Sequence, residues 1–430
     1  MFADLSGTAF AEKASKSDYA IPAELKPVWT WKKGYSAEES QSFRRAYLPD
    51  SGVTANDIGS WAASRMSEIG PSAIVHRNGP VSALKTKPMP EIADVTATTA
   101  LGTMTLREMM DDSRSRFKAI TVVHKGKVVF EKYIGIRDWD NHLWASATKI
   151  FNGTLGYIIS EEGLIDLEKP VPYYLPELKD TAWEGVKVAD ALHQRSGLDI
   201  SESRLGSAPD HPVTLFYAII GGDPNLPADV SLLYAVKASQ KRLEPGETFE
   251  YSSINTHVIT LILEKVTGKP IEDLITERIW SKAGMEGDGV LGLSADGEPM
   301  AFGAYAARLR DLARFGILFT PSWNTVAKER VVSENYFKKA NAAAKREAYG
   351  RDYMSQRLIK DFGGTDIGAS YQWDAVFPDG DLYKSGRTGQ CLYVSPETDT
   401  VVVWYSSAYK AEIWVHAYAR EIVKQVFRKK

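Results

Sequence analysis

Residues 142–149 read His-Leu-Trp-Ala-Ser-Ala-Thr-Lys, and they precede a stretch with helical periodicity. In that stretch, apolar side chains recur three or four positions apart, at Phe151, Leu155, Ile158 and Ile159. Gly153 and Gly156 lie between them. This pattern predicts a helix that is buried on several sides and closely approached by other parts of the chain at its glycines.

Ser146 stands where this helix is expected to begin, and Lys149 follows it by three residues. On a helix, that spacing puts the two side chains on one face, with their Cβ atoms roughly 5–6 Å apart. Unpaired N–H groups and the positive end of the helix dipole favour developing negative charge at such a serine. A partly desolvated lysine can lose its charge and act as a base. We therefore interpret Ser146 as a candidate nucleophile and Lys149 as its base.

The spacing Ser-x-x-Lys alone does not identify a site, because it occurs four times in the sequence. The four pairs are Ser82/Lys85, Ser115/Lys118, Ser146/Lys149 and Ser407/Lys410. The first runs into a proline-rich loop, the second lies in a charged run, and the last ends an apolar strand. Only Ser146 opens a helix with a buried pattern, and this context selects it.

Composition bounds the classes of protein that the chain can belong to. Its 430 residues are 44% hydrophobic and 25% charged, with a formal net charge of −3, as expected of a globular protein with no nucleic-acid or anionic-membrane partner. The single cysteine, Cys391, excludes an intrachain disulfide and a cysteine-rich metal site. No apolar run approaches the ~20 residues that span a bilayer. Residues 1–18 lack the apolar core of a signal peptide, which favours a cytoplasmic location; a periplasmic or secreted location stays open if a signal peptide has been removed.

Two hairpins and a run of helices define the expected fold. β-branched strands at 119–124 and 128–133 flank a glycine turn, and strands at 391–394 and 400–405 form a second pair. Helices are predicted at 188–194, 231–240, 256–266, 271–280, 309–319 and 412–427. Strands at both ends and helices between them indicate an α+β fold, in which terminal helices cover an antiparallel sheet.

The order of these elements suggests a division of the chain. Residues 1–105 are rich in proline and read as an irregular N-terminal extension packed on the main body. Residues 106–430 form the expected catalytic domain. Its α/β part comprises about 106–145 and 300–430, and its mainly helical part is about 146–299.

Two further motifs carry chemistry but are weak when taken singly. Tyr251 opens Tyr-Ser-Ser before a predicted helix, and a nearby lysine can depress the pKa of such a tyrosine so that it acts as a phenolate. Arg387-Thr388-Gly389 leads into a strand, where the arginine can hold a carboxylate. A G-x-S-x-G elbow, a Walker A loop and H-E-x-x-H are absent from the sequence. His142 and His257 lie near motifs, but a structural role is the better interpretation for each.

In the right order, the three motifs resemble the S-x-x-K, Y-x-N and K/H-T-G elements of the serine β-lactamase and penicillin-binding protein superfamily, in its class C and esterase-like branch. The flanking residues 163–178 and 192–198 are similar to segments of the same branch. Within it, the chain is most similar to the 6-aminohexanoate-dimer (nylon-oligomer) hydrolases. The resemblance covers roughly residues 75–410 and implies a β-lactamase/transpeptidase-like fold.

The resemblance also implies roles for individual residues. Ser146 would be the acylated nucleophile, and Lys149 with Tyr251 would take its proton and return it to the leaving group. The backbone N–H groups of Ser146 and Gln390 would form the oxyanion hole. Ser253 replaces the asparagine of lactamases, as in the nylon-oligomer hydrolases. Arg387 replaces lysine or histidine, followed by Thr388 and Gly389 as supporting residues; we take Arg387 to favour a substrate with a carboxylate.

The expected function is therefore a serine hydrolase that cleaves amides or esters of small acids, with no metal or cofactor. A small-molecule substrate is its expected partner, and the oligomeric state is left open. Three alternatives keep the fold and change the reaction: a D-amino-acid peptidase, a β-lactamase or an acyltransferase. A fourth is a catalytically silent protein that binds a peptide or cell-wall fragment.

Overall fold

We analysed a computed structural model of the chain, which describes residues 25–48, 56–227 and 230–428. The predictions made for residues 1–18 lie outside these ranges. Within them, no helix is both long enough and apolar enough to cross a membrane.

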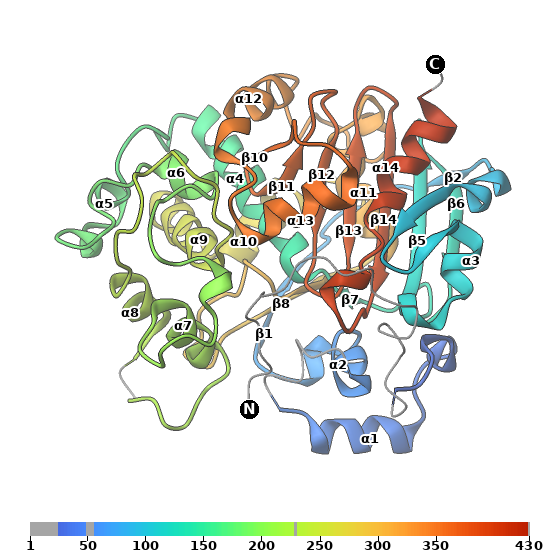
Figure 1. The fold of residues 1–430 in the computed structure, drawn as a ribbon, viewed down its shortest axis with the longest axis horizontal. Coiled ribbons are helices and arrows are strands. Elements are labelled where there is room, and N and C mark those ends of the chain that lie inside the picture. The colour runs from blue at the N-terminus through green and yellow to red at the C-terminus, as the bar shows by residue number, and fades with distance from the viewer. Residues whose placement is uncertain (1–24, 49–55, 228–229, 429–430) are drawn as a thin grey trace.

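An eight-stranded sheet forms the centre of the fold (Figure 1). Its strands are, in spatial order, β10 (Gly368–Ser370), β11 (Trp373–Val376), β12 (Leu382–Ser385), β13 (Cys391–Ser395), β14 (Thr400–Ser406), β5 (Phe117–His124), β6 (Lys127–Tyr133) and β2 (Lys85–Thr86). All neighbours pair antiparallel except β2 and β6, which are parallel. Both predicted hairpins, β5–β6 and β13–β14, are confirmed.

Helices cover both faces of this sheet because its strands bury alternate side chains on opposite sides. On β14, Val401, Val403 and Tyr405 join one apolar cluster, while Val402 and Trp404 join the other. Helix α11 (Leu309–Ile317) packs on the first face. Helices α3 (Leu106–Asp111), α13 (Tyr353–Phe362) and α14 (Ala417–Ile422) cover the second. The predicted α+β class, with an antiparallel sheet beneath terminal helices, is confirmed.

The predicted helical part occupies the middle of the chain, to the left of the sheet in Figure 1. Its helices are α4 (Lys149–Glu161), α5 (Val171–Tyr174), α6 (Val188–Leu192), α7 (Pro212–Ile220), α8 (Leu232–Lys237), α9 (Ser253–Thr267) and α10 (Ile271–Arg278). Helix α4 packs against α6, α9 and α10, so it is buried on several sides as its sequence predicts. Helix α12 (Asn335–Ala343) lies beside β10.

A second antiparallel sheet connects the N-terminal segment with the main body. Its order is β1 (Ser72–Val75), β8 (Gly289–Gly292), β9 (Tyr305–Ala307) and β7 (His142–Leu143). The N-terminal segment also contains α1 (Ala37–Ala46), α2 (Asp57–Ala62) and the hairpin β3 (Thr96–Thr99)–β4 (Gly102–Thr105). The proposed division at residue 105 stays a prediction.

The closing helix differs from its prediction as a continuous element over 412–427. A 3₁₀ turn at Ala411–Ile413 is followed by extended backbone at Trp414, and α14 begins only at Ala417. Tertiary contacts override the helical pattern: the Arg357 guanidinium lies 4.0 Å from the Trp414 ring, and the buried His416 hydrogen-bonds Tyr383. A π-helical turn, Val423–Phe427, ends the segment.

Candidate active site

Ser146 lies in a tight turn between β7 and α4. A 3₁₀ turn covers Ala145–Thr148, and the α-helix itself begins at Lys149. Ala145 holds a φ of 48°, a conformation that is costly for a residue with a side chain. The buried Trp144 ring fixes the turn from below, stacked 5.3 Å from Phe151. A strained, tightly packed turn thus presents the serine, which is the one partly exposed residue among 144–150.

The Lys149 side chain is fully buried and reaches back to Ser146. Its Nζ lies 3.2 Å from the Ser146 Oγ and 2.9 Å from the Ser253 Oγ. The Nζ also donates to the Phe302 carbonyl at 2.6 Å. The predicted nucleophile, its predicted base and one supporting residue therefore meet at a single nitrogen.

Tyr251 lies between two lysines. The Lys149 Nζ is 5.0 Å from the centre of its ring, and the Lys384 Nζ is 4.7 Å from it. The Lys384 Nζ also donates to the Tyr251 hydroxyl at 3.3 Å and pairs with the buried Asp374 carboxylate. The Ser146 hydroxyl lies close enough to the Tyr251 phenol to oppose the rise of its pKa. The three residues predicted to perform the chemistry thus form one contiguous cluster.

Burial shifts the acid–base properties of the cluster in opposite directions. Burial lowers the pKa of Lys149 to about 7, because the charged amine loses its hydration, although Glu202 opposes this shift. Burial raises the pKa of Tyr251 well above its ordinary value, and the negative charge of Asp374 adds to this effect. The sequence predicted that a lysine lowers the pKa of Tyr251 and makes it a phenolate, and the direction of this shift is wrong. At neutral pH the phenol keeps its proton, while Lys149 can be neutral.

Ser253 connects Lys149 to a carboxylate that sequence reasoning missed. Its Oγ donates to the Glu202 Oε1 at 2.5 Å and lies 3.3 Å from the Tyr217 hydroxyl. The Glu202 carboxylate is 4.0 Å from the Lys149 Nζ. Nothing in the sequence near Glu202 marks it, because its contacts come from residues about 50 positions away on either side.

The turn between β12 and β13 lies against the turn that carries Ser146. A Cβ atom on Gly386 would be 2.5 Å from the Trp144 carbonyl oxygen, so only glycine permits this approach. Gly389 has a φ of 88°, and the Gln390 side chain accepts from the Thr388 N–H. Arg387 is exposed at this turn. The proposed oxyanion role of the Gln390 N–H stays a prediction.

The positive charge of Arg387 acts on Tyr217, a neighbour of Ser253. Desolvation raises the pKa of Tyr217, and the positive charge of Arg387 opposes that shift. Since Tyr217 lies beside Ser253, the guanidinium acts within the surroundings of the Ser146 cluster. Among the described residues, Arg387 has no ion-pair partner, so its charge is available to a ligand.

Lys384 and Asp374 were not selected from the sequence, although Lys384-Ser385-Gly386 also has the lysine, hydroxyl and glycine of a K-T-G element. The two matches are consecutive, at 384–386 and 387–389, and strand geometry decides between them. Lys384 lies within β12 and points at Tyr251, whereas Arg387 lies beyond the end of the strand.

The two histidines near the motifs have structural surroundings. The His142 ring is buried, its Nε2 hydrogen-bonds the Lys118 Nζ at 3.2 Å, and the ring stacks on Tyr405. His257 is buried between Phe216 and Phe302. Neither ring contacts Ser146, in agreement with the structural interpretation.

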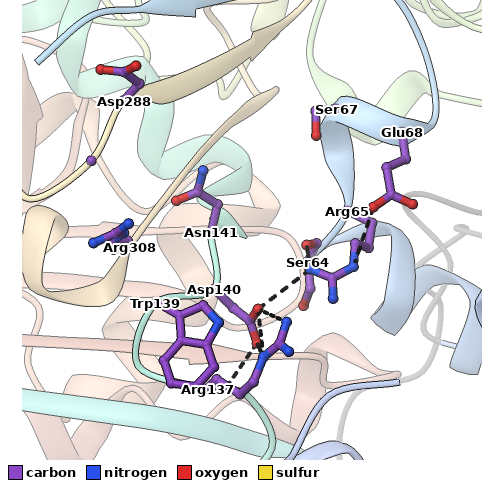
Figure 2. A pocket seen from close by; sticks show the side chains of 11 residues that line it. Ser64, Arg65, Ser67, Glu68, Arg137, Trp139, Asp140, Asn141, Asp288 and Arg308 are labelled. Atoms are coloured by element: carbon purple, nitrogen blue, oxygen red, sulfur yellow. Dashed lines mark hydrogen bonds and ion pairs between the residues drawn. The ribbon is translucent and has the colours of Figure 1, made fainter. Parts of the chain in front are cut away.

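A separate polar pocket of about 410 Å³ lies at the start of β7 (Figure 2). Ion pairs join Arg65 and Arg137 to Asp140 on its floor. None of the predicted site residues lines this pocket. The candidate active site is therefore defined by the side-chain contacts around Lys149.

Comparison with known proteins shows to which family the chain belongs. A model of the family described as Beta-lactamase matches residues 104–420. The chain belongs to the beta-lactamase family. Its match covers seven strands of the central sheet, all but β2, together with the helical part and the whole Ser146 cluster, so the predicted superfamily is confirmed.

One relative is a hydrolase, and solved structures of similar proteins share the fold. The 6-aminohexanoate-dimer hydrolase of Paenarthrobacter ureafaciens is 28% identical over 81% of this chain and 85% of its own. A solved Bacillus anthracis protein, provisionally named for the same activity, has a TM-score of 0.71 at 23% identity and covers 89% of this chain and 98% of its own. A family VIII carboxylesterase has a TM-score of 0.55 at 16% identity, over 80% and 98% of the two chains. The family and its hydrolase members confirm the predicted class of enzyme, a serine hydrolase.

Proposed function

We propose that the protein cleaves amide or ester bonds of small acyl substrates through an acyl-enzyme on Ser146. The observation that carries this proposal is the position of the Lys149 Nζ, 3.2 Å from the Ser146 Oγ and buried so that its pKa falls to about 7. A neutral amine at this distance can take the serine proton near neutral pH.

In the first step, the Ser146 Oγ attacks the substrate carbonyl carbon and its proton passes to the Lys149 Nζ. The C–O bond forms as the carbonyl π pair moves onto oxygen. When this intermediate collapses, the C–N or C–O bond to the leaving group breaks and that group takes a proton. The Tyr251 phenol lies beside Ser146 and Lys149, so it can deliver this proton and regain it from Lys149.

In the second step, water attacks the acyl carbon and gives a proton to the Lys149 Nζ. The bond between the acyl carbon and the Ser146 Oγ then breaks, the Oγ takes the proton back from Lys149, and the acid is released. Both intermediates place negative charge on the former carbonyl oxygen. We propose the Ser146 N–H as one donor to it, with the second supplied by the turn at 386–390, where the Arg387 and Gln390 N–H groups are candidates. Each such donor contributes about 3–4 kcal/mol in comparable enzymes.

For the substrate, we propose a small acid derivative that carries a carboxylate away from the scissile bond. The exposed Arg387 guanidinium supports this choice because it can bind a carboxylate bidentately. The relative that acts on 6-aminohexanoate dimers and the carboxylesterase support both amides and esters as substrates to be tested.

A panel of p-nitrophenyl esters and p-nitroanilides, each prepared with and without a terminal carboxylate, tests this proposal. We expect turnover by the wild type and a loss of about 10⁴–10⁶-fold in Ser146→Ala. Ser82→Ala is the matched control, since Ser82 also opens a Ser-x-x-Lys sequence but donates to the Val326 carbonyl. Absence of turnover and of any covalent adduct would favour the silent binding protein.

A further inference from the structure

Glu202 occupies a position from which it can control both the charge and the orientation of the Lys149 amine. Its Oε1 accepts the Ser253 hydroxyl proton at 2.5 Å and lies 4.0 Å from the Lys149 Nζ. The Glu202 side chain is 15% exposed and that of Lys149 is fully buried.

The backbone fixes the carboxylate in this place. Glu202 begins a 3₁₀ turn, Glu202–Arg204, whose first N–H donates to the Tyr251 carbonyl at 2.9 Å. The Ser201 side chain caps the turn and also bonds the buried Asp352. Glu202 is therefore tied to the segment that carries Tyr251 and Ser253, and it is not a mobile surface acid.

The hydrogen-bond directions around the lysine follow from this contact. A carboxylate oxygen only accepts, so the single Ser253 proton points at Glu202, and the Ser253 oxygen must accept from Lys149. The Phe302 carbonyl also only accepts from Lys149. A neutral lysine has two N–H groups and one lone pair. With both N–H groups directed to Ser253 and Phe302, the lone pair has the Ser146 hydroxyl as its remaining partner.

We propose that Glu202 is a positioning residue that directs the Lys149 lone pair at Ser146 by holding the Ser253 proton. This inference rests on the proposed function of Ser146 and Lys149. If Glu202 did not hold it, the Ser253 hydroxyl could turn and donate its proton to the lone pair. Lys149 would then be occupied by Ser253 and unable to deprotonate the nucleophile.

The negative charge of Glu202 has a second consequence, which can be measured. The charged groups facing Lys149 are Glu202, Lys384 and Asp374, and the phenol of Tyr251 lies beside it. Burial lowers the pKa of Lys149, while Glu202 raises it. Removal of the Glu202 charge should therefore lower the pKa of Lys149 further, and the rate of acylation should persist to more acidic pH.

Two substitutions separate the two effects. Glu202→Gln removes the charge but keeps an oxygen that can accept the Ser253 proton. We expect the acid limb of kcat/KM for an ester substrate to move down by about 1 pH unit or more, with a plateau close to that of the wild type. Glu202→Leu also removes the acceptor, and we expect its plateau to fall at least about tenfold. Asp199→Asn is the matched control: this acid lies on the same segment and pairs with Arg204 instead.

The outcomes distinguish this inference from the proposed function. The acid limb of kcat/KM for Glu202→Gln is measured on protein with a wild-type melting temperature. If this limb stays in place or moves to higher pH while Ser146 is still acylated, the role of Glu202 is overturned. If Glu202→Leu keeps the full plateau rate, the orienting role is also overturned. Failure of the wild type to form any adduct would instead reject the proposed function itself.

Discussion

The Lys149 Nζ lies 3.2 Å from the Ser146 Oγ, and its amine is fully buried beneath the serine. The three-residue spacing of the two residues does not by itself produce this contact. The turn at Ala145–Thr148, the Phe302 carbonyl and Ser253 hold the amine in place from three sides. The contact therefore depends on regions of the chain that are far apart in sequence.

The burial of Lys149 predicts the pH dependence of acylation. Burial lowers the pKa of this amine to about 7, so the reactive neutral form gains population as pH rises through 7 and is lost below it. We expect kcat/KM for a neutral ester to be about tenfold lower at pH 6 than on its plateau above pH 8. A profile from pH 5 to 9, with Ser146→Ala as the blank, measures this. A midpoint near 10 would show that the lysine keeps its ordinary pKa.

Arg387 should select substrates by charge. Arg387→Ala is expected to lower kcat/KM about 10–100-fold for esters with a terminal carboxylate, because a charge-assisted hydrogen bond is lost. Neutral esters of the same length should change little. Arg387→Lys, which keeps the charge without the bidentate geometry, should fall between. Equal losses for acidic and neutral substrates would remove the argument for a carboxylate.

Two glycines of helix α4 can be used to test how closely the chain packs around the helix that follows Ser146. A Cβ on Gly153 would lie 1.9 Å from the Tyr371 carbonyl oxygen, whereas one on Gly156 would lie 3.1 Å from a methyl of Leu192. Gly153→Ala must displace backbone and is expected to destabilise the fold by about 1–3 kcal/mol or more. Gly156→Ala needs only a side-chain adjustment and gains helix propensity of about 1 kcal/mol. Thermal denaturation of both variants checks this, and equal melting temperatures would contradict the described packing.

The buried pair Lys384–Asp374 predicts a large loss of stability on removal of one partner. Both side chains are 1% exposed, and the second Asp374 oxygen accepts from the Ser385 N–H and hydroxyl. Asp374→Asn is expected to cost about 3–5 kcal/mol because it leaves a buried amine without its counter-charge. The double variant Asp374→Asn/Lys384→Met should recover part of this loss. Glu168→Gln, at the exposed pair with Lys187, should leave the melting temperature unchanged. If Asp374→Asn also leaves it unchanged, the buried pair does not contribute as described.

The hairpins, the buried α4 helix and the pairing of Ser146 with Lys149 could be predicted from the sequence, because these signals are local: alternation, periodicity and a three-residue spacing. The proximity of Tyr251 was expected from the order of the motifs, and the catalytic roles of the three residues stay a prediction. The sequence could not predict partners that only the folded chain brings together. Glu202 reaches Ser253 across about 50 positions, and Lys384 was missed because strand register, not composition, distinguishes it from Arg387. The predicted direction of the Tyr251 pKa shift was also wrong. The motifs indicate a lysine near the phenol, which lowers its pKa, but they do not show the burial of the phenol, which raises it more.

The most direct test of the central claim is to locate the covalent intermediate. The wild type would be incubated with a fluorophosphonate, or briefly with a p-nitrophenyl ester and quenched in acid, and analysed by intact-mass measurement and peptide mapping. We predict one adduct per chain, on Ser146, that is absent in Ser146→Ala and present in Ser82→Ala. An adduct on another residue, or an equal adduct on Ser146→Ala, would contradict the account.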